Sequence, residues 1–60
     1  MNYLVTYDFA KYRPSNFAVF RMQSEFKKEI TSLNSESAKK LVGEEYGINP
    51  FYLKAELLTN

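Results

Sequence analysis

Acidic and hydroxyl side chains are the groups that could support catalysis in this 60-residue sequence, because the chain contains no Cys and no His. A nucleophilic serine is normally activated by a neighbouring histidine base. Each serine here lies instead among residues typical of turns and helix caps. These are Ser15, Ser24, Ser32, Ser35 and Ser37. We therefore predict that the protein has no catalytic residue of this kind.

The acidic residues give no stronger indication of an enzyme. Glu44 and Glu45 form an adjacent carboxylate pair, but neighbouring residues on a helix diverge by about 100° and cannot face one substrate together. Asp8 follows an apolar segment. We interpret it as a surface residue at a strand end, with a metal or hydrogen-bonding ligand as the alternative. We expect a protein without cofactor or metal that is not an enzyme.

Signals for phosphate and nucleic-acid binding are also weak. Gly43 and Gly47 fall at the end of a predicted helix rather than before its start, which excludes a glycine-rich phosphate loop. The run 11–13, Lys-Tyr-Arg, could hold a phosphate and stack a base. The net charge is only +1, whereas domains that rely on phosphate contacts carry a clear basic excess. Nucleic acid is therefore the less favoured partner.

The residues on either side of this basic run favour β-structure. Residues 3–9 alternate in character, with Tyr3 and Val5 on one face and Leu4 on the other, which predicts a strand. The polar segment 10–16 is typical of a turn. Residues 17–23 are predicted as a second strand that forms an antiparallel hairpin with the first. Residues 24–29 either extend that strand or cross towards a helix.

A helix and a final strand complete the predicted order. Helix-capping residues place the helix start at Ser32, Asn34 or Ser35. Gly47 favours a left-handed cap, and Pro50 prevents continuation. The apolar stripe of this helix comprises Leu33, Ala38, Leu41, Val42 and Tyr46. Residues 51–58 alternate as a third strand. The prediction is an α+β fold of order β-β-α-β, with one helix on one face of a three-stranded sheet.

Such a sheet leaves large apolar side chains without cover. The two predicted strands carry them on both faces, and one helix covers one face. An uncovered patch of this kind usually marks a contact surface. We expect the open face or an edge strand to pair with a second copy in a two-fold dimer. The alternative is that Phe26 and the long turn cover the second face.

Length limits the architecture further. A chain of 60 residues builds a single small domain, 1–60, whose core is close to the minimum for independent stability. No apolar run approaches the roughly 20 residues that span a bilayer. The N-terminus lacks the basic and apolar stretches of a signal peptide. We expect a cytoplasmic protein, with no membrane partner.

Two resemblances suggest a biological context. Residues 3–8, Tyr-Leu-Val-Thr-Tyr-Asp, resemble the first strand of the CRISPR adaptation nuclease family Cas-two, which implies a metal nuclease role for Asp8. Members of that family are longer, with two helices and four or more strands. Over nearly the whole chain, the pattern is similar to short uncharacterised proteins encoded by phages and prophages of Gram-positive bacteria. It comprises a Tyr-Leu-Val-Thr-Tyr start, a Phe-Ala-Val-Phe segment and a Gly-Ile-Asn helix exit.

The phage resemblance implies a small protein that binds and blocks a host protein, including defence enzymes. Our leading hypothesis is thus a non-enzymatic, homodimeric protein-binding module in the host cytoplasm. Tyr and Arg are favoured at contact centres. The predicted partner-binding residues are Tyr7, Phe9, Tyr12, Arg13, Phe20 and Met22. A nucleic-acid-binding protein that stacks bases on sheet aromatics is the second hypothesis. A magnesium nuclease that uses Asp8 across a dimer is the third.

Overall fold

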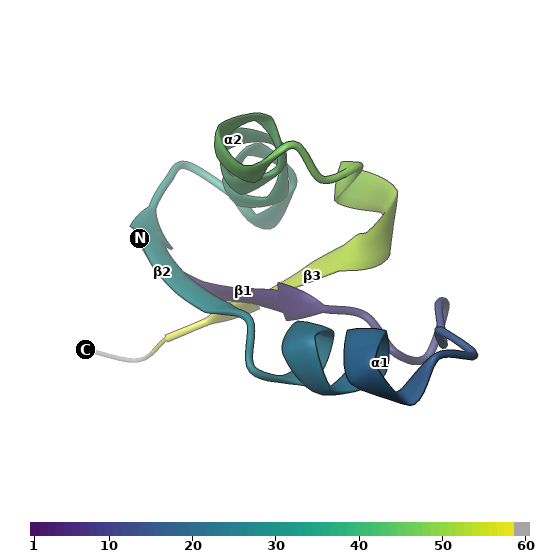
Figure 1. Ribbon diagram of the computed structural model, residues 1–60. Helices are drawn as coiled ribbons and strands as arrows, with labels where there is room; N and C mark the ends of the chain where they lie inside the picture. The colour runs from purple at the N-terminus through teal and green to yellow at the C-terminus, as the bar shows by residue number, and fades with distance from the viewer. Residues whose placement is uncertain (59–60) are drawn as a thin grey trace.

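A three-stranded antiparallel sheet with two helices forms the described part of the protein, residues 1–58 of a computed structural model (Figure 1). The strands are β1 (Asn2–Tyr7), β2 (Lys27–Thr31) and β3 (Leu53–Leu57). Helix α1 (Phe17–Ser24) connects β1 to β2, and α2 (Ser35–Tyr46) with a short 3₁₀ helix (Pro50–Tyr52) connects β2 to β3. The predicted α+β class is confirmed.

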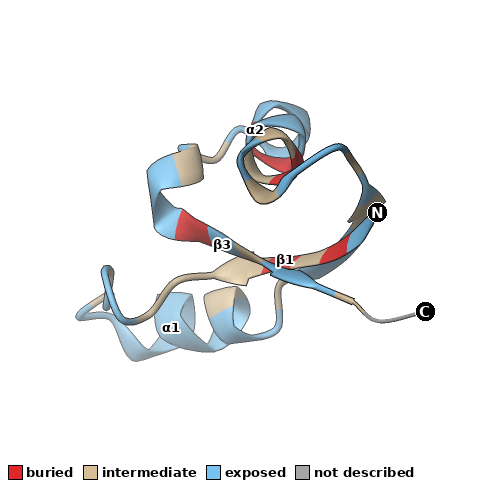
Figure 2. Cartoon of the chain, turned by 180° about the vertical axis from the view of Figure 1, so that it is seen from behind, coloured by how far each residue is buried: buried red, intermediate tan, exposed pale blue. Residues whose placement is uncertain are grey.

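β1 is the central strand, in the order β2-β1-β3. Tyr3 lies opposite Ile30 on β2 and Leu57 on β3, and Val5 lies opposite Lys28 and Ala55. This register places the apolar alternation of β1 on one face, as its sequence predicts. The buried core comprises Tyr3, Val5, Ala38, Val42 and Leu53. It lies between this face and α2 (Figure 2).

The α2 helix follows the sequence prediction closely. The Asn34 side chain accepts the Ser37 N–H at 2.8 Å, which identifies Asn34 as the N-cap. Gly47 ends the helix with φ 69°, and the Ile48 N–H donates to the Gly43 carbonyl at 2.9 Å. Of the predicted apolar stripe, Ala38 and Val42 are buried. Three stripe residues are exposed instead: Leu33, Leu41 and Tyr46.

The predicted strand over 17–23 is wrong, because this segment is helix α1. The Asn16 side chain accepts the N–H groups of Ala18 and Val19 at 2.9 and 3.2 Å. That cap favours a helix start. A seven-residue segment with five apolar residues fits both a two-residue and a 3.6-residue period, so the pattern alone could not decide. The second strand is β2, which falls largely within the stretch that the sequence left undecided.

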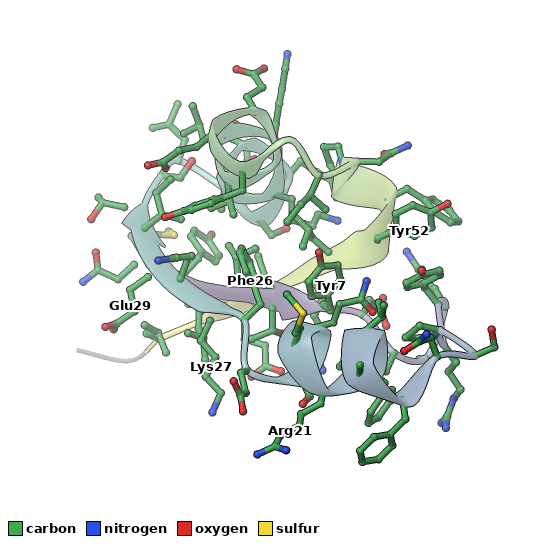
Figure 3. All side chains as sticks on the ribbon, viewed as in Figure 1. Tyr7, Arg21, Phe26, Lys27, Glu29 and Tyr52 are labelled. Atoms are coloured by element: carbon green, nitrogen blue, oxygen red, sulfur yellow. The ribbon has the colours of Figure 1, made fainter. Side chains whose placement is uncertain are left out.

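The single-helix prediction also needs correction, because α1 and α2 lie on opposite sides of the sheet (Figures 1 and 2). The sheet face away from α2 is polar rather than apolar. On β1 it carries Leu4 and Thr6. Leu4 lies opposite Glu29 and Glu56, and Thr6 lies opposite Lys27 and Lys54. Lys27 extends away from α2 (Figure 3). Phe17 and Met22 of α1, both highly exposed, therefore lie outside the sheet.

Candidate functional site

Helix α1 exposes most of its apolar residues. Five of its eight residues are apolar, namely Phe17, Ala18, Val19, Phe20 and Met22. Within Phe17–Ser24 no residue is buried, and the helix shows no red in Figure 2. Phe17 is 79% exposed and Met22 is 73% exposed. Large apolar side chains grouped in this way usually mark a contact surface.

A series of aromatic rings connects α1 to the rest of the fold. The ring centroids of Phe20 and Phe9 are 4.9 Å apart, and those of Phe9 and Tyr7 are 6.2 Å apart. Tyr7 also contacts Phe26 edge-on at 5.4 Å, and Phe26 contacts Tyr46 of α2 at 5.4 Å. Phe20 therefore attaches α1 to the end of β1, while the more exposed Phe17 is left out of this series.

A pocket of about 340 Å³ opens between α1 and the rings of β1 and Phe26. Its lining residues are Tyr7, Val19, Met22, Gln23 and Phe26. Tyr7 and Phe26 lie side by side, above α1 in the view of Figure 3. The Gln23 Oε1 atom is buried and has no hydrogen-bond partner among the described residues. The pocket is thus lined mostly by apolar side chains, together with the polar ends of Tyr7 and Gln23.

Charges near α1 are fully accessible. Arg21 Nε lies 3.9 Å from Glu25 Oε1, and both side chains are 72% exposed. Arg21 points away from the sheet (Figure 3). An exposed ion pair contributes little to stability. These two side chains remain available to contact a partner at the edge of the apolar surface.

A second aromatic cluster lies in the loop after β1. The ring centroids of Tyr12 and Tyr52 are 4.6 Å apart, and Tyr52 contacts Phe51 edge-on at 5.5 Å. Lys11 Nζ lies 5.4 Å from the centre of the Phe51 ring. Arg13 in the same loop is exposed. Lys11 therefore lies beside rings that already pack against one another, while Arg13 is exposed in the same loop.

Asp8 organises this loop. Its carboxylate accepts the Ala10 N–H at 3.1 Å, and its carbonyl accepts the Lys11 and Tyr12 N–H groups at 3.1 and 3.0 Å. Lys11 Nζ lies 3.9 Å from the carboxylate. These contacts account for a charged residue at the end of an apolar strand. Within residues 1–58 no group of three acidic side chains is placed to hold a metal ion.

Comparisons with protein-family models, with curated proteins and with solved structures find no significant match. Among the described residues, no helix is both long and apolar enough to cross a membrane.

The six residues predicted to bind a partner fall into two groups. Tyr7, Phe9, Phe20 and Met22 come together around α1. Tyr12 and Arg13 lie in the loop beside Tyr52.

The sequence prediction missed four residues of the α1 surface: Phe17, Val19, Gln23 and Phe26. The first three fell on a segment assigned as a strand, where they would have lain on the face opposite Phe20 and Met22. Asn16 was the signal that could have found them, because a capping residue directly before an apolar run favours a helix.

Proposed function

We propose that this protein is a non-enzymatic protein-binding module, and that α1 with its adjoining pocket is the contact surface. One observation carries the proposal. Within Phe17–Ser24 five apolar residues form a helix in which none is buried. Burying a large apolar side chain stabilises a complex by about 1.5–3 kcal/mol. A partner could bury most of the side-chain area of Phe17 and Met22, because both residues are more than 70% exposed.

The length of α1 supports the same proposal. An isolated helix shorter than about 12–15 residues is marginal in water, and α1 has eight residues. Asn16 caps the helix locally, and α1 contacts the rest of the fold through the Phe20–Phe9 ring contact and the residues that line the pocket. A partner that covers Phe17 and Met22 would supply the burial that α1 lacks within the chain.

The pocket indicates what the partner presents. Its lining residues are mostly apolar, and the polar groups they carry are the Tyr7 hydroxyl and the Gln23 side-chain amide. A side chain with an apolar body and a donor at its tip, such as Tyr or Trp, matches this combination. Such residues dominate the centres of protein interfaces. We expect an aromatic donor of the partner to occupy the pocket.

The biological context of the proposal comes from the sequence pattern. The similarity to short phage and prophage proteins of Gram-positive bacteria supports a bacterial host protein as the partner, with inhibition as the outcome. Defence enzymes are one class of such partners. In this role the protein acts by occupying a surface of the host protein, so it needs no catalytic group of its own.

Base stacking on the sheet has less support. Proteins that bind single strands combine a basic groove with exposed rings. The sheet face away from α2 carries Leu4, Thr6 and two charges of each sign, and within residues 1–58 no aromatic ring belongs to it. Tyr12, the ring of the basic loop, packs against Tyr52. The geometry therefore favours a protein partner.

The test compares two exposed apolar positions. Met22→Glu places a charge on the α1 surface, and Leu33→Glu places one at the start of α2, where Leu33 is 87% exposed. Immobilised wild-type protein is first used to isolate and identify a partner from a Gram-positive host lysate. The purified partner is then titrated against wild type and both variants by calorimetry, with circular dichroism to verify the fold.

We expect Met22→Glu to weaken the binding free energy of the partner by at least about 2 kcal/mol, as at an interface hot spot. Leu33→Glu is expected to leave the affinity unchanged. The reverse ranking would overturn the proposal, as would a host partner that binds both variants equally well. The double variant Tyr12→Ala, Arg13→Ala then measures whether the loop belongs to the same contact. The sequence-based hypothesis expects this double substitution to abolish binding with the fold intact.

A further inference from the structure

β3 offers a second surface, because it lies at the edge of the sheet. Within residues 1–58 its one neighbouring strand is β1. The Leu58 N–H donates to the Asn2 carbonyl, and the Asp8 N–H donates to the Tyr52 carbonyl, each at 2.8 Å. Residues of an antiparallel strand bond to alternate sides. The even-numbered residues of this segment therefore bond to β1, and Leu53, Ala55 and Leu57 direct their backbone groups to the free edge.

The sequence of β3, Leu-Lys-Ala-Glu-Leu, is complementary to itself when it is reversed. We propose that β3 pairs antiparallel with β3 of a second copy, about a two-fold axis through Ala55. In that register Lys54 lies opposite the partner's Glu56, and Leu53 lies opposite the partner's Leu57. Opposite charges directly across an antiparallel pair are stabilising. A two-fold axis makes both ion pairs form together.

The backbone fits this register. The backbone groups of Leu53, Ala55 and Leu57 all face the free edge. In the proposed register these residues therefore meet those of the second copy as hydrogen-bonded pairs. The Leu53 N–H is already bonded to the Pro50 carbonyl. The Ala55 pair exchanges two bonds, and each Leu57 N–H reaches the partner's Leu53 carbonyl. Pairing thus satisfies edge groups without breaking a bond that the monomer makes.

The side chains fit it as well. Lys54 Nζ lies 3.6 Å from Glu56 Oε1 of the same strand. The two-fold axis turns this pair into a cluster of four alternating charges on the face away from α2. On the other face, Leu57 is 57% exposed while Leu53 is buried. The partner's Leu53 lies across from Leu57 but is already buried in its own core, so the charged face rather than this apolar pair supports the register.

The other edge strand of the sheet, β2, does not pair opposite charges about a two-fold axis. A two-fold axis through the middle residue of β2 sets Glu29 opposite the partner's Glu29, and like charges across a strand pair are destabilising. β2 also begins with Lys27 and Lys28, and lysines at an edge strand typically prevent pairing. Self-association through β3 is therefore favoured. It uses a surface separate from α1 and does not depend on the proposed function.

Charge exchange between two variants tests the register directly. Both Lys54 and Glu56 are exposed, so their substitution leaves the core intact. Glu56→Lys and Lys54→Glu each set like charges opposite each other in a homodimer. In a mixture of the two variants, every cross-strand pair is attractive again. Sedimentation equilibrium from micromolar to millimolar protein measures the mass of wild type, of each variant and of the equimolar mixture.

We expect wild type to approach twice the 7.0 kDa monomer mass as its concentration rises. Each single variant is expected to dimerise about tenfold more weakly, and the mixture is expected to recover the wild-type affinity. Ala55→Pro removes an edge N–H that β1 does not use and is also expected to prevent dimerisation.

Three kinds of result would overturn the proposal. The first is a wild-type protein that stays monomeric to millimolar concentration. The second is single variants that dimerise as wild type does, or a mixture that fails to recover. The third is a dimer that Phe17→Asp abolishes and Ala55→Pro leaves intact, because that dimer would form through α1. None of these results depends on whether a host protein binds α1.

Discussion

The two helices of this protein differ in how their sequences relate to burial. α1 has five apolar residues among eight and, within Phe17–Ser24, none buried. α2 is more polar, yet Ala38, Val42 and Gly43 are buried in it. Both begin with an asparagine cap. The apolar content of a helix therefore does not decide whether that helix stabilises the fold. What decides it is whether the helix lies over the apolar face of the sheet.

The largest expected contrast comes from placing a charge on each helix. Val42→Asp introduces a carboxylate into the core, where Val42 is 1% exposed, and we expect it to destabilise the fold by more than about 4 kcal/mol. Phe17→Asp changes an exposed residue in the first turn of α1, and we expect an effect within about 0.5 kcal/mol. Thermal unfolding followed by circular dichroism distinguishes them. Equal melting temperatures would show that α1 contributes to the core.

A smaller effect is expected at the two glycines of α2. A Cβ at Gly43 would meet the Ile48 carbonyl oxygen at 2.5 Å and Pro50 Cγ at 3.1 Å. The resulting strain exceeds the gain of about 1 kcal/mol in helix propensity. We expect Gly43→Ala to cost about 1–2 kcal/mol.

Gly47→Ala provides the matched comparison. Nothing lies within 4 Å of a Cβ at Gly47, where φ is +69°, so its cost of about 1 kcal/mol is purely conformational. Urea unfolding measures both variants. A Gly43→Ala variant more stable than wild type would mean that the segment after α2 moves away from the helix.

The smallest effect is expected at the helix caps. Asn34→Ala removes the acceptor for the Ser37 N–H and should lower the free energy of unfolding by about 1 kcal/mol. Asn16→Ala removes the acceptor for Ala18 and Val19. We expect it to fray α1 locally and to leave global stability within about 0.5 kcal/mol of wild type.

Native-state hydrogen exchange checks this difference residue by residue. The amides of α1 should exchange faster in Asn16→Ala, while those of β1 and α2 remain as in wild type. An equal loss of global stability in both cap variants would contradict the contrast between the helices, because α1 would then unfold together with the core.

The sequence predicted α2, β1 and β3 well, because their signals are local. Asn34, Gly47 and Pro50 define the ends of α2 by capping chemistry within a few residues. The alternation of β1 predicted which of its residues share a face. The segment 17–29 was predicted poorly. Its apolar run is short enough to fit a strand or a helix, and Lys27–Thr31 becomes a strand through its pairing with β1.

The candidate site was predicted in part for the same reason. Aromatic and apolar composition pointed to Phe9, Phe20 and Met22, which do lie together at α1. Composition could not show that Phe26 lines a pocket with Met22 and Gln23, because Phe26 lies outside α1 and its distance from the helix depends on the turn after α1. It also could not show that Tyr12 packs on Tyr52, 40 residues away.

By itself the sequence determined the α+β class, the strand-end position of Asp8 and the helix with its two caps, because each depends on neighbouring residues. Only the tertiary structure decided that the sheet face away from α2 is charged, that the apolar residues of α1 are exposed, and that β3 is a free edge. Those features depend on which strand pairs with β1 and in which register. Pairing and register are set by contacts between residues far apart in the chain.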